Sequence, residues 1–414
     1  MIISGQDYKQ TKRYLEGTHR NRSPEQTVQT FSKLMPHFGI TRLANVTGLD
    51  CLGVPVYVSI RPNSRSLAVS QGKGIIAAAA KASALMESSE LWHAERVSVP
   101  LAFESFDALA KHSAVADIEK LSRRPRLELD PRRPILWAKG FDLMRGVDTW
   151  VPYEMVSLNL VGNTYEEAIF EMSSNGLASG NHLLEAIEHG LCELIERDAV
   201  TMWWLQDKSK LADYRVDLNS VDRSSDCRGV LDKLELAEMQ VAVWDITSDT
   251  GVPAYMCALA EKAGRVGWRT LGAFWGYGCH LSKDIAISRA VTEAAQARLT
   301  IIAGSRDDNF KAQYQRQTNA HALETLRERL LNGTGVVDFS LRQSRSTDTF
   351  ESDVEHLLEA LRGIGIDSAI VVDLTRPDLG VPVAKVIVPG LEGYHWHETY
   401  RPGARALAKG AHAP

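Results

Sequence analysis

The sequence has few cysteines, no excess of basic residues and no long apolar run, and each shortage excludes a class of protein. Its 5 cysteines are scattered along 414 residues without a CxxC spacing, which argues against a disulfide framework and a zinc knuckle. Lysine and arginine total 47 against 52 acidic residues, so no basic field attracts nucleic acid. No segment approaches the roughly 18 apolar residues that span a bilayer, and the first residues lack an apolar signal region. We therefore expect a cytoplasmic protein with neither nucleic acid nor membrane as a partner.

The composition that is present, 44% hydrophobic and 24% charged residues, is typical of a globular protein with a substantial core. We expect an N-terminal extension over residues 1–40, a main domain over 41–400 and a C-terminal tail over 401–414. Patterning predicts strands within 40–61, 135–156 and 241–278 and near the end of the main domain. It predicts helices over 75–96, 182–200 and 283–303 and a long helical stretch over about 317–362. The expected fold class is α/β of the mixed α+β kind, with mixed sheets.

The first helix combines carboxylates with an apolar setting. Ser83, Glu87 and Glu90 fall on one narrow stripe of a helix that is otherwise rich in alanine and leucine. Carboxylates in such a setting are costly unless they are paired or bind a cation. Mg²⁺ would supply that partner, since it takes a few carboxylates together with phosphate oxygens and water. A buried ion pair with a nearby arginine is the alternative.

The second helix is less decisive when it is taken alone. Glu185, His189, Glu193 and Glu196 lie opposite an apolar face, which is also how an ordinary surface helix looks. Both helices, however, follow a glycine-rich loop and carry a Glu-x-x-Glu pair, and backbone N–H groups at helix N-termini bind phosphate. Lys73, between two glycines, adds a charge that could reach a phosphate, although its surroundings are not a Walker sequence.

The third helix carries one polar stripe, and the remaining candidates are weaker. That stripe consists of Arg289, Glu293, Gln296 and Thr300, whereas Arg298 lies off it among apolar neighbours. Arg306 follows in an SRDD turn, where a capping role is as good an interpretation as a functional one. His395 and His397 have the spacing of zinc ligands on a strand but no clear third ligand. Cys279 and His280 are adjacent on a strand, so they point to opposite faces.

Three long segments resemble the signature stretches of the YcaO family, in the order that this family has. They are SALMESSELWHAE, SNGLASGNHLLEAIEHGLCELIERDA and SRAVTEAAQARLTIIAGSRDD. The segment GITRLANVTGLDCLGVPVYVSIRPNSRSLAVSQGKG is most similar to YcaO proteins that work beside a TfuA partner. The resemblance covers roughly residues 40–400. It implies a YcaO-type fold of mixed sheets with an ATP site formed by three helices.

The resemblance also assigns roles to residues. It implies that Glu87, Glu90, Glu193 and Glu196 bind Mg²⁺ and serve catalysis. It implies that the nucleotide is contacted by a larger set: Lys73, Ser83, Glu87, Asn181, Glu185, Arg197, Arg289, Glu293, Gln296 and Arg298. The cofactors are then ATP and Mg²⁺.

The implied reaction is phosphorylation of the oxygen of a peptide backbone amide, followed by loss of phosphate. A TfuA-like partner and a sulfide or other sulfur donor would make the product a thioamide in a ribosomally made peptide or protein. The chain ends in GAHAP rather than the proline-rich tail of azoline formers, which disfavours the alternative of a cyclodehydratase, or amidine former, acting on Cys, Ser or Thr. A non-catalytic peptide-binding scaffold is the alternative of another class. The sequence leaves a homodimer open.

Overall fold

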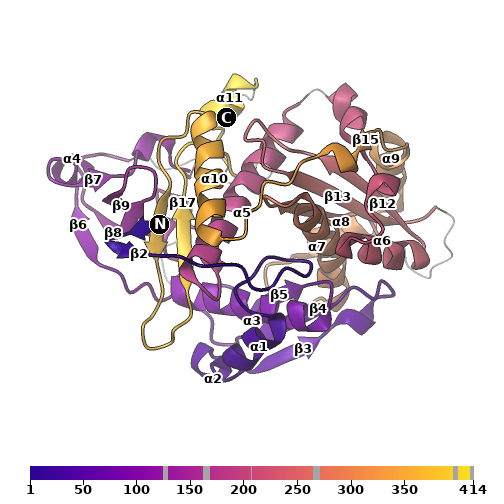
Figure 1. The fold of residues 1–414 in the computed structure, drawn as a ribbon, viewed down its shortest axis with the longest axis horizontal. Coiled ribbons are helices and arrows are strands. Elements are labelled where there is room, and N and C mark those ends of the chain that lie inside the picture. Colours follow the sequence, from indigo (N-terminus) through magenta and orange to yellow (C-terminus); the bar gives the residue numbers. More distant parts are fainter. Residues whose placement is uncertain (125–128, 162–167, 207, 264–270, 395–399, 411–414) are drawn as a thin grey trace.

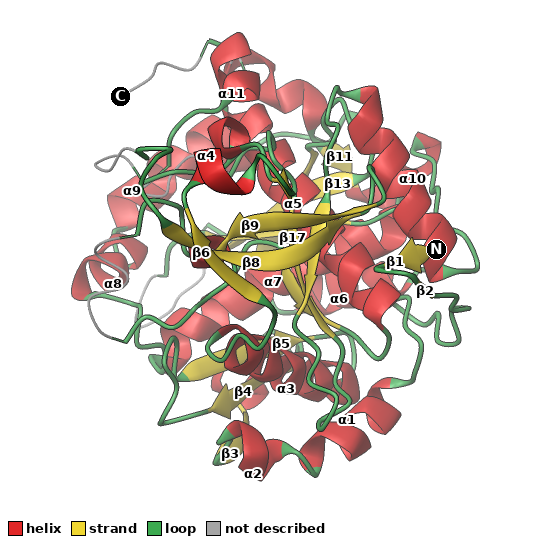
Figure 2. Ribbon diagram, turned by 90° about the vertical axis from the view of Figure 1, so that its left-hand side faces the viewer, coloured by secondary structure: helices red, strands yellow, loops and turns green. Residues whose placement is uncertain are grey.

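The computed structural model describes residues 1–124, 129–161, 168–206, 208–263, 271–394 and 400–410, which form three main sheets with helices packed on them (Figures 1 and 2). Two sheets have three antiparallel strands each, in the orders β3-β4-β5 and β12-β13-β14. The largest has seven strands in the order β10-β17-β16-β8-β9-β7, with β6 also paired to β8, and only β7 and β9 run parallel in it. The mixed α+β class is therefore confirmed, although the strands predicted within 241–278 form an antiparallel sheet rather than a mixed one.

Most strands of these sheets lie within the predicted segments, but β6, β7 and β10 were not predicted. The bounds of all these strands are β3 (Arg42–Asn45), β4 (Val56–Ile60), β5 (Val69–Lys73), β6 (Leu101–Glu104), β7 (Ala114–Val115), β8 (Ile135–Asp142), β9 (Val147–Pro152), β10 (Leu177–Ser179), β12 (Met239–Asp245), β13 (Ala254–Glu261), β14 (Phe274–Cys279), β16 (Ile370–Asp373) and β17 (Val383–Ile387).

Three units, each a strand followed by a long helix, set up the architecture. They are β5 with α3 (Ala77–Ala94), β10 with α5 (Leu183–Trp204) and β14 with α7 (Lys283–Ala303). Each helix begins four residues after its strand ends, at 77 after 73, at 183 after 179 and at 283 after 279. The sequence predicted the first two units as a repeat. The third has the same layout, so the three helices start from equivalent places.

Two glycines let helices lie directly on their strands. A Cβ added to Gly72 of β5 would come within 2.1 Å of the backbone nitrogen of Ala84 on α3, and one on Gly276 of β14 within 2.2 Å of the carbonyl oxygen of Ala290 on α7. No side chain fits at such a distance, so the seating of α3 and α7 depends on these positions.

Helix α5 is a central helix of the molecule, not the surface helix that its amphipathic pattern allowed. Leu184, Ile187, Leu191 and Ile195 are fully buried on its apolar side. Its other side is also covered, because Glu196 is only 4% exposed. The acidic side of α5 therefore faces protein or an internal pocket rather than bulk solvent.

The prediction of one long helical stretch over about 317–362 is wrong. The chain forms α9 (Ala320–Leu326) and a short π-helical turn (Arg327–Leu331), then the two-residue strand β15 (Val337–Asp338), and only then α10 (Phe350–Gly363). Gly333 has a φ of 135°, and a Cβ on Gly335 would meet the backbone of Val216 at 2.2 Å. These glycines end the helical run and let β15 pair with β11 (Val216–Asp217).

Shorter elements complete the described part of the chain. They are β1 (Ile2–Ile3), β2 (Gln6–Asp7), α1 (Pro24–Ser32), α2 (Met35–Phe38), α4 (Phe106–Leu109), α6 (Asp226–Leu236), α8 (Lys311–Gln317) and α11 (Ala404–Ala408). None of the helices of the described residues is both long and apolar enough to cross a membrane.

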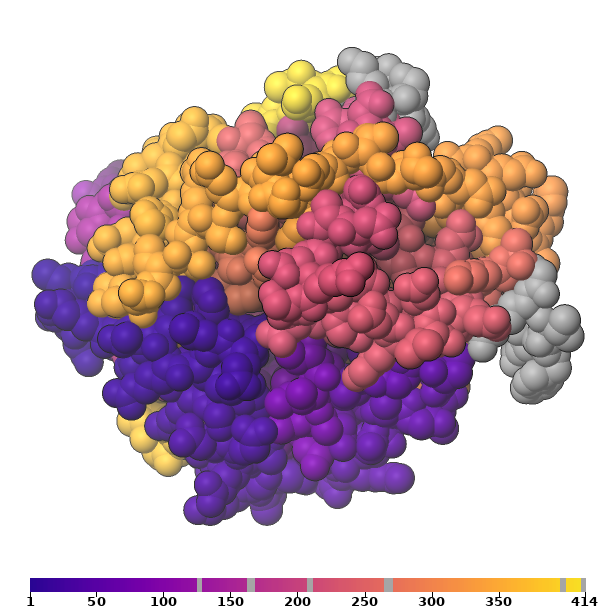
Figure 3. Space-filling model, turned by 45° about the vertical axis from the view of Figure 1, so that its right-hand side comes forward, coloured from indigo at the N-terminus to yellow at the C-terminus, as the bar shows by residue number. Residues whose placement is uncertain are grey.

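Residues 1–40, expected as an extension, lie along the body of the protein. Thr11 bridges to Thr349 just before α10, and the Lys12 ammonium forms a fully buried ion pair with Asp353 of α10. Helix α1 packs against α3. The space-filling view shows this indigo segment lying against the orange part of the chain (Figure 3). The first 40 residues are thus integrated with the region predicted as residues 41–400.

Candidate active site

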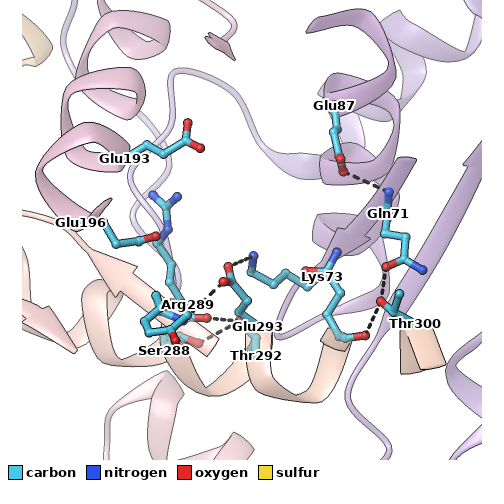
Figure 4. A network of polar contacts seen from close by, with 12 residues as sticks. Gln71, Lys73, Glu87, Glu193, Glu196, Ser288, Arg289, Thr292, Glu293 and Thr300 are labelled. Atoms are coloured by element: carbon cyan, nitrogen blue, oxygen red, sulfur yellow. Dashed lines mark hydrogen bonds and ion pairs between the residues drawn. The ribbon is translucent and has the colours of Figure 1, made fainter. Parts of the chain in front are cut away.

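A cavity of about 560 Å³ lies between α3, α5 and α7, a volume within the range of small-molecule sites. Most of the residues predicted for the site line it: Lys73, Ser83, Glu87, Glu90, Asn181, Glu193, Glu196, Arg197, Arg289, Glu293 and Gln296. In Figure 4, Glu193 and Glu196 lie on one side of an open space and Glu87 on the other, with Lys73 and Glu293 along the floor. The fold therefore gathers residues that are more than 200 positions apart in the sequence, such as Lys73 and Glu293, into one pocket.

Glu87 and Glu90 of α3 accept hydrogen bonds only from neutral donors among the described residues. The backbone N–H of Gln71 donates to Glu87 at 3.0 Å, and the N–H and hydroxyl of Ser179 donate to Glu90 at 2.8 and 2.7 Å. Burial raises the pKa of Glu87, and burial together with the charge of Glu87 raises the pKa of Glu90 to about 8. A bound cation would remove this desolvation penalty, so the pair has the chemistry of a metal site.

Glu193 and Glu196 on α5 share a single cation. The Arg197 guanidinium donates to Glu193 at 2.9 Å and forms a short ion pair with Glu196. Even with that partner, burial raises the pKa of Glu196. Two carboxylates beside one arginine leave negative charge at the pocket wall that faces α3, which a divalent cation would neutralise.

The described residues do not form a closed metal cage. No three His, Cys, Asp or Glu side chains among them lie close enough together to enclose an ion. That arrangement suits Mg²⁺, which is bound in nucleotide sites by one or two carboxylates, phosphate oxygens and retained water. The carboxylates of α3 and α5 therefore fit a metal that arrives with a nucleotide rather than one held by protein alone.

Cationic side chains lie along the α7 side of the pocket. Lys73 binds Glu293 of α7 at 2.8 Å, and the N–H of Tyr277 donates to the other oxygen of Glu293. Burial opposes ionisation of Glu293, but the charges of Lys73 and Arg197 outweigh it and lower the pKa of Glu293. Arg289 contacts His189 of α5 at 2.9 Å. These cations are placed to meet phosphate oxygens.

Two of the predicted contact residues lie outside the lining of the pocket. Glu185 is 1% exposed and accepts the N–H of Asn21 at 2.9 Å, with Arg20 at 3.6 Å. Arg298 is bound by Asp50 at 2.8 Å and by Glu261 at 2.9 Å. Both residues are held by other parts of the fold, so the structure does not bring them to the pocket with the others.

Sequence reasoning missed several residues that do line the pocket. Gln71, His189 and Arg306 lie beside the predicted set, and Arg20 and Arg22 reach it from the N-terminal segment. His189 was noticed on the polar side of its helix and Arg306 in its SRDD turn, but neither was assigned to the site. Nothing in the local sequence around residues 20–22 indicates a pocket, because their placement depends on the long-range contacts of residues 11–21.

The weaker candidates gain no support. Cys279 is buried, and burial with the neighbouring Cys192 raises the pKa of its thiol well above the ordinary value, which leaves it an inert thiol. His280 contacts Glu188 at 3.3 Å instead of a nucleophile. His395 and His397 lie outside the described residues.

Comparison with known proteins decides the family. The model of the YcaO cyclodehydratases, described as ATP- and Mg²⁺-binding, matches residues 71–392. This chain belongs to the YcaO family. ATP and Mg²⁺ are accordingly its cofactors, and it is an ATP-dependent enzyme of a family that modifies the peptide backbone.

Relatives by sequence cover most of this YcaO protein. An uncharacterized protein in the tfuA 3′ region of Rhizobium leguminosarum bv. trifolii is 39% identical over 372 residues, which are 88% of this chain and 87% of that one. An uncharacterized protein of Methanothermobacter thermautotrophicus is 35% identical over 377 residues, 89% of this chain and 94% of the other.

Solved structures show the same fold. The YcaO protein of Methanopyrus kandleri, bound with AMPPCP and Mg²⁺, has a TM-score of 0.73 at 22% identity over 95% of this chain and 98% of that one. A heterocyclase in complex with substrate and cofactor has a TM-score of 0.75 at 24% identity over 94% of this chain. This YcaO protein spans only 54% of the heterocyclase, about half its length.

Proposed function

We propose that this YcaO protein uses ATP and Mg²⁺ to phosphorylate the oxygen of a peptide backbone amide, and that it installs a thioamide there with a TfuA-like partner. The observation that carries the proposal is the 39% identity to a protein of a tfuA region, together with the acidic pocket between α3, α5 and α7. The partner is suggested by the tfuA region of that relative, the thioamide product by the resemblance to TfuA-associated YcaO proteins, and the activation chemistry by the family.

In this proposal the residues of the pocket divide into three roles. Glu87 and Glu90 on one side, and Glu193 and Glu196 on the other, hold Mg²⁺ with the phosphates. Lys73 and Arg289 on the α7 side bind phosphate oxygens and balance their charge. Ser83, Asn181 and Gln296 line the same pocket and supply neutral hydrogen bonds to the nucleotide.

The chemical logic is that an amide oxygen is a poor leaving group. When bound, ATP with Mg²⁺ supplies the phosphoryl group that turns this oxygen into a good one. The protein then needs to hold the amide oxygen toward the phosphates, to keep water out and to keep the charges of the pocket fixed. Buried carboxylates and paired arginines give such a preorganised setting. Because the reaction consumes ATP, the proposal places the protein in the cytoplasm.

Two alternatives remain as rivals. An azoline former would use a Cys, Ser or Thr side chain of the substrate as nucleophile, and the fold likeness to a heterocyclase favours it. A non-catalytic scaffold would bind peptide without turning over ATP. Its weakness is physical, since a scaffold gains nothing from several buried carboxylates without a cation.

The test is mass spectrometry of a candidate precursor peptide incubated with the protein, ATP, Mg²⁺, sulfide and the TfuA-like protein. Exchange of oxygen for sulfur adds about 16 Da, the result that the proposal predicts, and phosphate must appear with it. Loss of water without uptake of sulfur would assign the azoline or amidine reaction instead. If no phosphate is released with every component present, the scaffold is favoured.

A further inference from the structure

A second, smaller cavity adjoins the nucleotide pocket. It measures about 50 Å³ and is lined on its floor by Leu194, Arg197 and Lys385 and at its mouth by the exposed residues Lys120 and Ser122. We call it the side chamber. A water molecule needs about 10–15 Å³ of such volume, so the chamber has room for three or four water-sized molecules and none for a peptide.

The side chamber and the nucleotide pocket share a wall. Arg197 lines both cavities, and in the segment 173–175 Ser174 lines the pocket while Ser173 and Asn175 line the chamber. A small molecule in the chamber is therefore separated from the pocket by one guanidinium and three residues of chain. Arg197 comes directly after Glu196 on α5, so this wall lies beside the glutamates of the nucleotide pocket.

Lys385 of β17 brings a positive charge into this chamber. Its side chain is buried, and its ammonium donates to the carbonyls of Ser173 at 2.6 Å and Asn175 at 2.7 Å. Within the described residues no carboxylate forms an ion pair with it, so two of its three N–H groups are engaged and one remains. Burial lowers the pKa of Lys385 to about 8, although the nearby charges of Glu193 and Glu171 favour its ammonium form.

Two other charged residues of the chamber, Arg197 and Glu392, are held by partners, and Glu171 adds a carboxylate to the lining. Arg197 is bound by Glu193 and Glu196. Glu392 accepts the backbone N–H groups of Gly403 and Ala406 and the hydroxyl of Tyr400. Lys385 keeps one N–H group for a small ligand, in a space too small for anything larger.

We propose that the side chamber binds hydrosulfide on Lys385 and delivers it to the amide beside Arg197. The inference rests on the thioamidation proposed above and adds the site of its second substrate. Sulfide that enters from the chamber does not have to pass the bound nucleotide, whose pocket lies on the other side of the wall.

The chemistry balances with the components named. The sulfur of hydrosulfide forms a bond to the amide carbon while the carbonyl oxygen takes the γ-phosphoryl group of ATP, whose bond to the β-phosphate breaks so that ADP leaves. The carbon–oxygen bond then breaks with its electron pair, phosphate departs with the S–H proton, and a C=S bond remains. Lys385 holds the anion before the attack and takes no part in bond making.

A lysine that merely anchors the wall and one that binds sulfide can be told apart kinetically. For Lys385→Met we expect the KM for hydrosulfide to rise at least about tenfold while the KM for ATP stays within about twofold. Lys139→Met, a surface lysine of β8 that pairs with Asp148, is the matched control and should change neither. If the two constants of Lys385→Met rise together, or neither rises, the lysine is only an anchor and the proposal fails.

A binding experiment without turnover separates this inference from the proposed function and covers a variant that does not fold. Crystals of the wild-type protein soaked in sodium bromide, an anion of similar size to hydrosulfide, should show anomalous density beside the Lys385 ammonium. Absence of bromide from the chamber would overturn the chamber as an anion site even if thioamide is formed. Bromide bound there, in a protein that never incorporates sulfur, would leave the anion site standing and sink thioamidation.

Discussion

At the scale of single residues, the two carboxylates of α3 are the most unusual feature of the molecule. Glu87 and Glu90 line the pocket without an ion pair to lysine or arginine among the described residues. Stability alone would not favour such residues, because a buried carboxylate without a cation costs free energy.

Replacing Glu87 with glutamine tests its role as a metal ligand. The change keeps the shape of the side chain and its hydrogen bond from Gln71 but removes the charge. We expect the affinity for Mg²⁺–AMPPCP, measured by calorimetry, to fall by at least about tenfold, and the melting temperature without ligand to stay level or rise.

The matched control is Glu188→Gln on α5. Glu188 is also buried but contacts His280 and does not line the pocket. It should leave the affinity for the nucleotide within about twofold. Unchanged affinity in Glu87→Gln would remove the metal interpretation of α3.

The raised pKa of Glu90 predicts a pH dependence of stability. Its ordinary value is 4.5 and burial raises it to about 8. Between these values an unfolded Glu90 ionises while the folded one keeps its proton, so the unfolding free energy of the metal-free protein falls as pH rises from about 5 to about 8. Urea titrations across this range should show a shallower fall in Glu90→Gln. Equal slopes in the two proteins would contradict a protonated Glu90.

The sequence predicted the pocket residues best where a charge lies on an apolar helix. Glu87 and Glu90 are recognisable from their setting alone, whereas Glu193 and Glu196 needed the repeated loop and helix and the family resemblance. Helical periodicity gives the face of a helix but not what covers that face. The N-terminal segment covers Glu185, and Asp50 with Glu261 binds Arg298, and neither contact can be read from local sequence.

At the scale of elements, the seating of helices on glycines decides where the charged side chains lie. In Gly276→Ala the new methyl group would have to displace α7, whose backbone lies 2.2 Å from it. We expect a loss of about 2 kcal/mol in unfolding free energy and weaker nucleotide binding, because α7 carries Arg289 and Glu293.

Gly229→Ala on the exposed side of α6 is the control for that change. Nothing lies within 4 Å of a Cβ at this position. Alanine should therefore stabilise the protein by about 0.5–1 kcal/mol through its helix propensity. If both variants behave alike in thermal unfolding, close packing of α7 on β14 is not what holds the helix.

The contact of the C-terminal tail with α5 gives a second prediction at this scale, which concerns stability. Arg405 of α11 donates two hydrogen bonds of 2.9 Å to the fully buried Asp198 of α5, the neighbour of Arg197. Arg405→Met leaves the buried Asp198 with only the backbone N–H of Glu392 as a donor and no cation, so we expect a loss of about 3 kcal/mol in unfolding free energy. Lys409→Met, at an exposed position of the same tail, should be neutral. A neutral Arg405→Met would show that the tail does not brace α5.

Patterning located the long helices well, and α7 has the predicted bounds of 283–303. It failed over about 317–362, where Gly333 and Gly335 interrupt a polar helical pattern to pair β15 with β11. Propensity favours helix there, but a long-range strand pairing decides the outcome. The three-residue strand β10 was also beyond local patterning, since the sequence indicates only a glycine-rich loop.

At the scale of the whole molecule, the site exists only because three distant units converge. The pocket draws Lys73 and Glu87 from the first unit, Glu193 from the second and Glu293 from the third. The strand-to-helix repeat can be read from the sequence, but its convergence cannot, since no local pattern fixes how the three sheets pack. The family resemblance supplied that missing step.

The central claim is that Mg²⁺ and nucleotide bind between α3, α5 and α7. The most direct measurement is anomalous diffraction from crystals grown with AMPPCP and Mn²⁺ in place of Mg²⁺. The expected result is a manganese peak at bonding distance from a nucleotide phosphate and from at least one of four carboxylates. These are the carboxylates of Glu87, Glu90, Glu193 and Glu196. Nucleotide bound elsewhere, or manganese without contact to any of these four glutamates, would contradict the claim.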